Sequence, residues 1–281
     1  MSASPPSPVA SVIIPAHDEA AFIGQCLEAL LASECDAPFE VIVVANGCKD
    51  DTAARARKAA ESASRPLNVI ETAQGGKPNA LQLGDTAARG TTRIYLDADV
   101  LVSPGLIAAL IAALEDEAPR YAGGTPVIST ARSALTRAYA RFWQRLPFFR
   151  TGVPGFGIYA VNHAGRARWS TWPDIISDDT FARLQFAPEE RVRVEPTYTW
   201  PMVEGIGRLI RVRRRQDRGV AQVMDVFPEL GVNADRIPDA RARKARAALR
   251  DPLGFVVYAT VALCVRAFGN GARPGAWERG R

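Results

Sequence analysis

The first third of the chain alternates between short β-branched runs and segments whose apolar residues recur at helical spacing. Such alternation constrains the fold strongly, because parallel strands need a crossover connection, usually a helix, between them. The expected strands cover residues 11–14, 40–44, 67–70 and 93–96, and the expected helices cover residues 20–32, 51–63 and 77–88. This pattern predicts an α/β fold with a mainly parallel central sheet and helices on both faces.

The rest of the chain is less regular. Ser103-Pro104 is typical of a helix start, with the serine as N-cap. Further strands are expected at residues 122–129 and 157–161, and further helices at residues 133–145, 178–185 and 204–224. The predicted organisation is a disordered Ser- and Pro-rich leader (1–8), one α/β domain (9–225) and a C-terminal helical, basic appendage (226–281).

Two aspartates that flank one alanine, Asp97-Ala98-Asp99, directly follow the apolar run Ile94-Tyr95-Leu96. Open α/β sheets bind their ligands at the carboxyl ends of the strands, where this pair is expected to lie. Carboxylate oxygens are hard ligands, so the pair suits Mg²⁺ or Mn²⁺ holding a diphosphate. The alternative for an isolated Asp-x-Asp is a solvated turn.

Three further loops are expected at the same edge of the sheet. They are residues 15–20 after the first strand, 45–52 after the second and 75–81 before the third helix. Helix N-termini and Lys77 would supply positive potential for a polyphosphate nucleotide lying across them. Taken singly, the loops have plainer interpretations: a helix start, a turn at Asn46-Gly47 and a flexible glycine pair at Gly75-Gly76.

A second acidic pair, Asp178-Asp179, lies at an expected helix start. A carboxylate there can act as a general base that takes a proton from an attacking hydroxyl. The alternative is a helix cap without catalytic role. The glycine-rich segment 152–157 is either a plain loop or a segment that leaves room for a bound sugar or acceptor.

Positive charge is concentrated in the last third of a chain whose net charge is +5. The basic residues either form solvated helix faces or bind anionic partners such as phosphates or acidic lipid headgroups. Nucleic acid is a weaker alternative, because no nucleic-acid motif accompanies the charge. The stretch 253–265 is apolar but, at about 13 residues, too short to span a bilayer, which leaves a packed or an interfacial helix. The basic residues of the last third form two clusters. The first comprises Arg208, Arg211, Arg213, Arg214, Arg215 and Arg218, and the second comprises Arg241, Arg243, Lys244, Arg246 and Arg250.

The four cysteines form no Cys-x-x-Cys pair, and the chain has only two histidines. This composition argues against a zinc site and is typical of reduced thiols in a cytoplasmic protein. Peripheral contact with the inner face of the plasma membrane is a hypothesis that follows from the basic, apolar C-terminal region.

As an ordered set, these motifs resemble family 2 glycosyltransferases with the GT-A (Rossmann-like) fold, over about residues 9–185. The resemblance implies that Pro15, Ala16 and Glu19 contact the base and ribose of a nucleotide-sugar. It also places the segment containing Lys77 and Asn79 near the nucleotide and phosphates. It implies that Asp97, Ala98 and Asp99 contact the ribose and the diphosphate, with Mn²⁺ or Mg²⁺ held by Asp99 and Asp97. Asp179 inherits the role of general base, supported by Asp178, and such a base implies inversion at the anomeric carbon.

Two departures from the family pattern refine this hypothesis. Where the family often has Asp-Asp-Gly-Ser, with an aspartate that touches the base, this chain has Ala45-Asn46-Gly47-Cys48. Asn46 is therefore the candidate there, and uridine is not implied. The Gln-x-x-Arg-Trp signature of polymer synthases is missing, which favours transfer of a single sugar.

The resulting hypothesis is an inverting, metal-dependent glycosyltransferase that moves a single sugar from a nucleotide-diphosphate sugar to an acceptor hydroxyl. A lipid-linked molecule and a glycan are the alternatives for the acceptor. Two other functions are weighed against it: a sugar-phosphate nucleotidyltransferase, and a non-catalytic scaffold associated with membranes.

Overall fold

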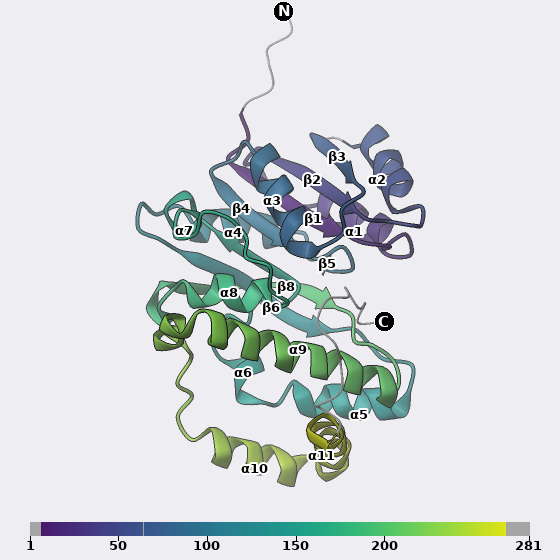
Figure 1. The fold of residues 1–281 in the computed structure, drawn as a ribbon, viewed down its shortest axis with the longest axis vertical. Coiled ribbons are helices and arrows are strands. Elements are labelled where there is room, and N and C mark those ends of the chain that lie inside the picture. The colour runs from purple at the N-terminus through teal and green to yellow at the C-terminus, as the bar shows by residue number, and fades with distance from the viewer. Residues whose placement is uncertain (1–6, 64, 268–281) are drawn as a thin grey trace, which may run out of the picture.

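A computed structural model describes residues 7–63 and 65–267 of the chain (Figure 1). Its centre is an eight-stranded sheet with the strand order β3-β2-β1-β4-β7-β6-β8-β5. The predicted α/β class with a central sheet, flanking helices and a helical C-terminal region is confirmed. Residues 1–6 of the expected leader lie outside the described residues.

The N-terminal half of the sheet is parallel, as the sequence predicts. β2 pairs with β1 and β3, and β1 pairs with β4, all in parallel register. The strands are β1 (Ala10–Ala16), β2 (Phe39–Asn46), β3 (Leu67–Thr72) and β4 (Thr92–Leu96), and the helices between them are α1 (Ile23–Leu31), α2 (Thr52–Glu61) and α3 (Lys77–Ala87).

Alternate residues of β1 are buried against different helices on its two faces. Val12 and Ile14 belong to the same core cluster as Leu27 and Leu30 of α1. Ile13 points to the other face, where a Cβ added to Gly84 of α3 would lie only 2.4 Å from the Ile13 side chain. Burial on both faces explains why consecutive residues of this strand, Val12 to Ile14, are all apolar.

The second half of the sheet is mixed in direction. β7 runs antiparallel to β4 and β6, and β8 pairs parallel with β6 and antiparallel with β5. The elements are β5 (Leu101–Val102), α4 (Leu106–Ala113), β6 (Tyr121–Ile128), α5 (Ala134–Trp143), α6 (Pro147–Arg150), β7 (Ile158–Val161), α7 (His163–Arg166), α8 (Asp178–Leu184), β8 (Arg191–Trp200), α9 (Ile206–Val226), α10 (Ala240–Arg250) and α11 (Pro252–Ala267).

The reversed direction of β7 brings a loop to the end of β4. Ile158, at the start of β7, pairs with Leu96, at the end of β4. The Asp97 N–H consequently donates to the Gly157 carbonyl over 2.8 Å. The glycine-rich segment before β7 therefore lies beside the Asp97-Ala98-Asp99 turn.

One predicted helix start is wrong. α4 begins at Leu106, and Gly105 rather than Ser103 is its N-cap. The Ser103 hydroxyl instead accepts a hydrogen bond from the Thr197 N–H (3.1 Å), next to the pairing of β5 with β8. Strand pairing with β8, a long-range contact, holds this segment out of the helix.

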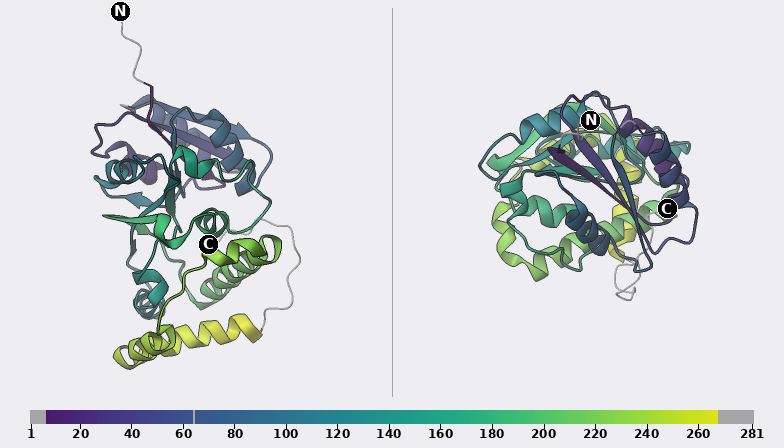
Figure 2. Two further views of the ribbon diagram at one scale, coloured as in Figure 1. Left: turned by 90° about the vertical axis from the view of Figure 1, so that its left-hand side faces the viewer. Right: turned by 90° about the horizontal axis from the view of Figure 1, so that it is seen from above.

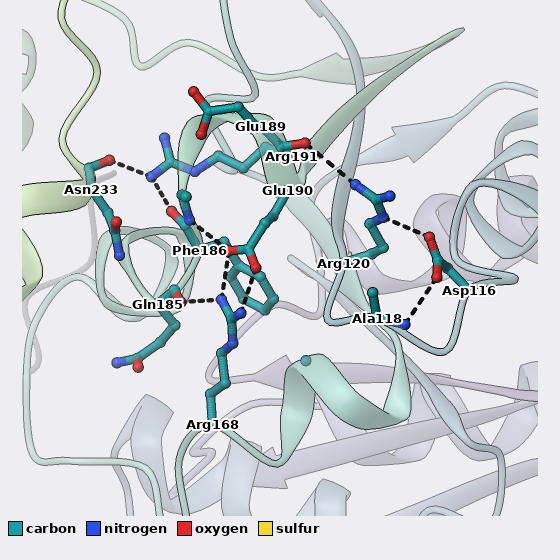
Figure 3. Close-up of polar contacts among 12 residues, drawn as sticks. Asp116, Ala118, Arg120, Arg168, Gln185, Phe186, Glu189, Glu190, Arg191 and Asn233 are labelled. Carbon is teal, nitrogen blue, oxygen red and sulfur yellow. Dashed lines mark hydrogen bonds and ion pairs between the residues drawn. The ribbon is translucent and has the colours of Figure 1, made fainter.

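A polar network fastens the end of α8 to β8 (Figure 3). The Arg168 guanidinium contacts both carboxylate oxygens of Glu190, at 2.7 and 2.5 Å. Arg191 donates to the Phe186 and Asn233 carbonyls at 2.6 and 2.5 Å. These contacts fix α8 at the end remote from Asp178 and Asp179.

The last helices pack back onto the body of the protein. Tyr258 of α11 stacks on Tyr139 of α5 with ring centroids 5.8 Å apart. Figures 1 and 2 show α10 and α11 at the end of the long axis opposite β1, β2 and β3. No helix in the described part of the chain is both long and apolar enough to cross a membrane.

Asp251, between α10 and α11, joins these helices to α5. Its buried carboxylate receives the Arg141 Nε–H over 2.8 Å, pairs with Arg145 at 2.6 Å and accepts from the Gly254 N–H at 3.0 Å. The hydrogen bond from Arg141 lowers the pKa of Asp251. The resulting stabilisation is present at neutral pH and is lost as pH falls through this lowered pKa.

We expect Asp251→Ala to lower the free energy of unfolding at neutral pH by about 2 kcal/mol, since hydrogen bonds to charged groups contribute ~1.5–3 kcal/mol each and partly exposed arginines weaken them. Urea unfolding at neutral and acidic pH measures the effect, which should shrink in acid. Asp36→Ala, at an exposed position, is the control and should change little. Equal stability of the Asp251 variant and the wild type would contradict the assignment.

Candidate active site

A cleft of about 320 Å³ lies at the carboxyl ends of β1 and β4 and extends to α8 and α9. One wall is acidic and polar, and the other is apolar and aromatic. The polar wall includes Pro15, Glu19, Lys77, Asp97, Ala98, Asp99, Asp178 and Asp179. The structure therefore brings both acidic pairs, separated by about 80 residues of sequence, to one cavity.

The Lys77 ammonium group connects the two acidic pairs. Its Nζ lies 2.8 Å from Asp97 Oδ1 and 2.9 Å from Asp178 Oδ1. Burial disfavours the charged form of Lys77, but attraction by Asp178 and Asp97 outweighs it, so the pKa of Lys77 is raised. The lysine therefore stays cationic and holds β4, α3 and α8 around one point.

Asp178 has both carboxylate oxygens engaged. Oδ1 faces Lys77, and Oδ2 accepts a hydrogen bond from the Tyr159 hydroxyl at 3.0 Å. The residue is 4% exposed. Asp178 is thus a fixed, buried carboxylate whose two oxygens both have protein partners.

Asp179 lies beside it with part of its surface open to the cleft. The Thr180 N–H donates to Asp179 Oδ1 at 2.7 Å. Burial, and then the charge of Asp178, raise the pKa of Asp179 to about 6, although Lys77 opposes the shift. A carboxylate with this pKa is ionised at neutral pH and can still accept a proton readily.

α9 holds the segment that leads into the acidic pair. Gln222 accepts the Ile176 N–H at 2.9 Å through its side-chain oxygen. A Cβ added to Gly219 would lie 2.3 Å from the Ser177 hydroxyl oxygen, so only glycine allows this close packing. Asp178 and Asp179 are therefore positioned by the long basic helix as well as by Lys77.

Two glycines shape the cleft between β4 and β7. Gly155 and Gly157 both line it and have φ angles of +78° and +80°, which favour glycine. A Cβ at Gly155 would come within 2.2 Å of the Tyr121 hydroxyl oxygen. The segment 152–157 contributes cavity wall rather than only a connection.

Asn46 has a structural environment that the sequence did not predict. Its side chain is fully buried; its amide donates to the Ala16 carbonyl at 2.8 Å, and its oxygen accepts the Gly76 N–H at 3.0 Å. It thus ties together the three loops after β1, after β2 and before α3. Ala16, Asn46 and Asn79 do not line the cleft, and the Asn79 amide donates to the Gln74 carbonyl at 3.3 Å.

Two arginines of the first basic cluster line the cleft, Arg213 and Arg215. Burial lowers the pKa of Arg213, but its 2.8 Å hydrogen bond to Asp217 and nearby tyrosines outweigh burial and raise it. The structure therefore indicates which arginines of the cluster reach the cleft, whereas their spacing in the sequence did not distinguish them from the other four.

The aromatic wall was missed by the sequence analysis. Trp143 of α5 stacks on Trp200 at 5.8 Å, and Phe156 packs against both rings at 5.5 and 5.0 Å. All three line the cleft together with Tyr139, Met202, Val203 and Leu209. Single aromatic residues from distant segments carry no local signal that would assemble them.

The carboxylates of Asp97 and Asp99 fit a divalent cation. Both line the cleft with hard oxygen donors, and Asp97 already holds the cationic Lys77. One or two carboxylates plus substrate phosphates are a common way to bind Mg²⁺.

A second group, Asp18, Cys48 and Asp50, also has ligand atoms within 4.8 Å of one another. It fits less well, because burial raises the pKa of the Cys48 thiol, and a metal binds the thiolate rather than the thiol.

Comparison with known proteins agrees with this geometry. The glycosyl transferase family 2 model matches residues 11–168, more than half of the chain. The chain belongs to glycosyl transferase family 2. Membership of this family favours the first of the three functions weighed from the sequence.

Similar proteins include the uncharacterized glycosyltransferase EpsJ of Bacillus subtilis, 33% identical over 103 residues that cover 37% of this chain and 29% of the relative. An undecaprenyl-phosphate 4-deoxy-4-formamido-L-arabinose transferase of Pseudomonas savastanoi is 29% identical over 136 residues, or 47% of this chain and 38% of the relative. The chain thus matches well under half the length of these relatives.

Two solved structures have the same fold. The mannosyltransferase PcManGT of Pyrobaculum calidifontis, in complex with GDP-Man and Mn²⁺, has a TM-score of 0.58 at 21% identity and covers 96% of this chain and 77% of its own. TarS 1-349 of S. aureus, in complex with UDP-GlcNAc, has a TM-score of 0.52 at 14% identity and covers 92% of this chain and 90% of its own. These likenesses support the GT-A fold.

The raised pKa of Asp179 predicts a measurable pH dependence of stability. A carboxyl group whose pKa rises on folding stabilises the folded state below its unfolded pKa of ~4, and this contribution is lost as pH rises through about 6. We expect Asp179→Asn to be more stable than the wild type by about 2 kcal/mol at neutral pH, and the difference to shrink towards about pH 4.

Denaturant unfolding across this pH range measures the difference. Asp174→Asn, in the exposed loop before α8, is the matched control and should follow the wild type. If the wild type is as stable as Asp179→Asn at neutral pH, burial and the charge of Asp178 do not raise the pKa of Asp179.

Proposed function

We propose that this enzyme is an inverting, metal-dependent glycosyltransferase that moves one sugar from a nucleotide-diphosphate sugar to an acceptor hydroxyl. The observation that carries the proposal is the Lys77 bridge from Asp97 to Asp178. Through this bridge, Asp97 and Asp99, which suit a cation bound to a diphosphate, share one cleft with Asp179, a separate carboxylate whose pKa is raised. Single displacement needs this division of roles.

The donor would lie along the loops at the ends of β1 and β4. Pro15 and Glu19 line the cleft where the nucleotide is expected, and Asp97, Ala98 and Asp99 follow it towards the diphosphate. Mn²⁺ or Mg²⁺ held by Asp99 and Asp97 would neutralise charge on the leaving diphosphate. Lys77, Arg213 and Arg215 add positive potential around the same region.

Asp179 rather than Asp178 is the proposed general base. Asp178 has one oxygen on Lys77 and the other on Tyr159, whereas Asp179 faces the cleft. Asp179 would take the proton of the acceptor hydroxyl as its oxygen bonds to the anomeric carbon. The bond from that carbon to the diphosphate breaks, its electron pair leaves with the diphosphate, and the configuration inverts.

The aromatic wall indicates an acceptor with apolar surface. Trp143, Phe156 and Trp200 can pack against a lipid chain or against the apolar face of a sugar. The name of the similar Pseudomonas enzyme contains a lipid phosphate, undecaprenyl phosphate. We propose a lipid-linked acceptor, with a glycan as the alternative, for an enzyme that works in the cytoplasm at the inner membrane surface.

Asp179→Asn should lower kcat by about 100- to 10,000-fold, the usual contribution of a general base. The affinity for the donor nucleotide should change little, since Asp179 is assigned to the acceptor side. Wild-type kcat/KM should fall towards acid with a midpoint near pH 6, the pKa of Asp179. Transfer assays and calorimetric titration with the nucleotide measure both quantities.

Asp174→Asn is the control for this experiment and should retain full activity. If Asp179→Asn transfers sugar at the wild-type rate, Asp179 is not the base.

Metal dependence should appear as a thermal shift. In a panel of nucleotide-sugars with UDP, GDP and other bases, the matching donor should raise the melting temperature more with Mn²⁺ than without it, because ligands that bind only the native state stabilise it. Asp99→Asn should lose the Mn²⁺-dependent part of the shift.

Asp50→Asn, in the alternative group with Asp18 and Cys48, should keep the Mn²⁺-dependent shift. Loss of that shift in Asp50→Asn but not in Asp99→Asn would move the metal to the other group.

A further inference from the structure

α10 and α11 form one end of the molecule. Figure 1 shows α10 lying across the long axis and α11 seen along its own axis; the quarter-turn in Figure 2 exchanges these views. Both helices therefore lie roughly in a plane perpendicular to the long axis, on the far side from the N-terminal strands. Lys244 of α10 lies 5.0 Å from the Tyr258 ring of α11, which shows that the two helices are in contact.

This end of the molecule exposes large apolar side chains. Leu249, Leu253, Val256 and Leu263 are 84%, 65%, 58% and 64% exposed and are among the six most exposed large hydrophobic residues in the described part of the chain. Leu253, Val256 and Leu263 follow one another at helical spacing along α11. The opposite face of α11, with Gly254, Tyr258, Val261 and Val265, is buried against the body of the protein.

The same end is strongly basic. α10 carries five exposed cationic residues, Arg241, Arg243, Lys244, Arg246 and Arg250. Of the two acidic residues that flank α10, Asp251 is buried and paired with Arg141 and Arg145, so only the exposed Asp239 offsets this charge at the surface. Exposed apolar side chains beside a cluster of arginines are the combination that binds the headgroup region of anionic bilayers.

We propose that the α10–α11 surface, formed by Leu249, Leu253, Val256, Leu263 and the five basic residues of α10, docks the enzyme on an anionic lipid bilayer. The helices lie on the membrane rather than cross it, since α11 buries its other face against α5 and α9. A second copy of the chain fits less well, because a symmetric dimer through this surface would bring two basic clusters together.

Docking here would place the bilayer close to the cleft. Tyr258 of α11 stacks on Tyr139, a residue of the cleft wall, and its ring lies 6.0 Å from the guanidinium of Arg213, another. Helix α11 and the Tyr258–Tyr139 contact therefore lie between the docking surface and the cavity. The inference concerns binding alone and does not depend on the proposed chemistry, because lipid binding needs neither donor nor metal.

The test is co-sedimentation of the full chain with vesicles. Phosphatidylcholine vesicles with about 30% phosphatidylglycerol should bind the wild type, and pure phosphatidylcholine should bind it much more weakly, because each basic residue near an anionic surface strengthens binding about fivefold. Binding should weaken with added salt without vanishing, since the apolar contacts remain.

Two variants separate the two contributions. Arg243→Gln/Arg246→Gln should weaken binding to anionic vesicles by about 30-fold, from the same per-residue effect. Leu253→Gln/Val256→Gln/Leu263→Gln should abolish the binding that persists in high salt. All of these side chains are exposed, so the melting temperatures should stay close to that of the wild type.

Arg55→Gln/Lys58→Gln, on the exposed face of α2 at the other end of the molecule, removes the same charge and is the matched control. It should bind vesicles like the wild type. The proposal is overturned if the wild type fails to bind anionic vesicles, or if the α2 control weakens binding as much as the α10 variant. It is also overturned if the triple α11 variant only dissociates a dimer and leaves vesicle binding unchanged.

Discussion

The site depends on one partly buried cation, the ammonium group of Lys77. It lies between Asp97, which follows β4, and Asp178, which begins α8. Without it, two carboxylates from distant parts of the chain would face each other in a partly buried cleft, where like charges repel strongly. The lysine converts that repulsion into attraction, and it does so at the N-terminus of α3, a helix fixed to β1 by Gly84.

The surrounding structure serves this arrangement from three sides. The antiparallel β7 brings Gly157 to the Asp97 N–H and supplies Tyr159, whose hydroxyl group holds Asp178. Asn46 fastens the loops after β1, after β2 and before α3 to one another. α9 presses Gly219 against Ser177 and so sets the start of α8. With Asp178 immobilised, burial and its negative charge raise the pKa of the neighbouring Asp179, and the two carboxyl groups acquire different properties.

The predictable part of the structure is the part encoded by local pattern. The strands β1 to β4 were predicted because they are short β-branched runs between helical segments, and β1 and β2 are in addition fully buried. The acidic pairs could be placed at a strand end and at a helix start because apolar residues precede them. β8 was missed, since Arg191, Arg193 and Glu195 make a half-exposed strand look like a polar loop. The Lys77 bridge, the Tyr159 hydrogen bond and the aromatic wall around Trp143 join residues far apart in sequence, so no local signal announces them. Ser103 shows the same limit, because pairing of β5 with β8 overrides a good helix-capping sequence.

The central claim is that both acidic pairs serve one reacting centre, and a crystal structure with an unreactive nucleotide-sugar analogue and Mn²⁺ tests it most directly. The manganese ion, located by its anomalous signal, should contact the Asp99 carboxylate and the diphosphate. The anomeric carbon should face Asp179 on the side opposite the diphosphate. Manganese at Asp18, Cys48 and Asp50, or a sugar bound with its anomeric carbon turned away from Asp179, would contradict the account.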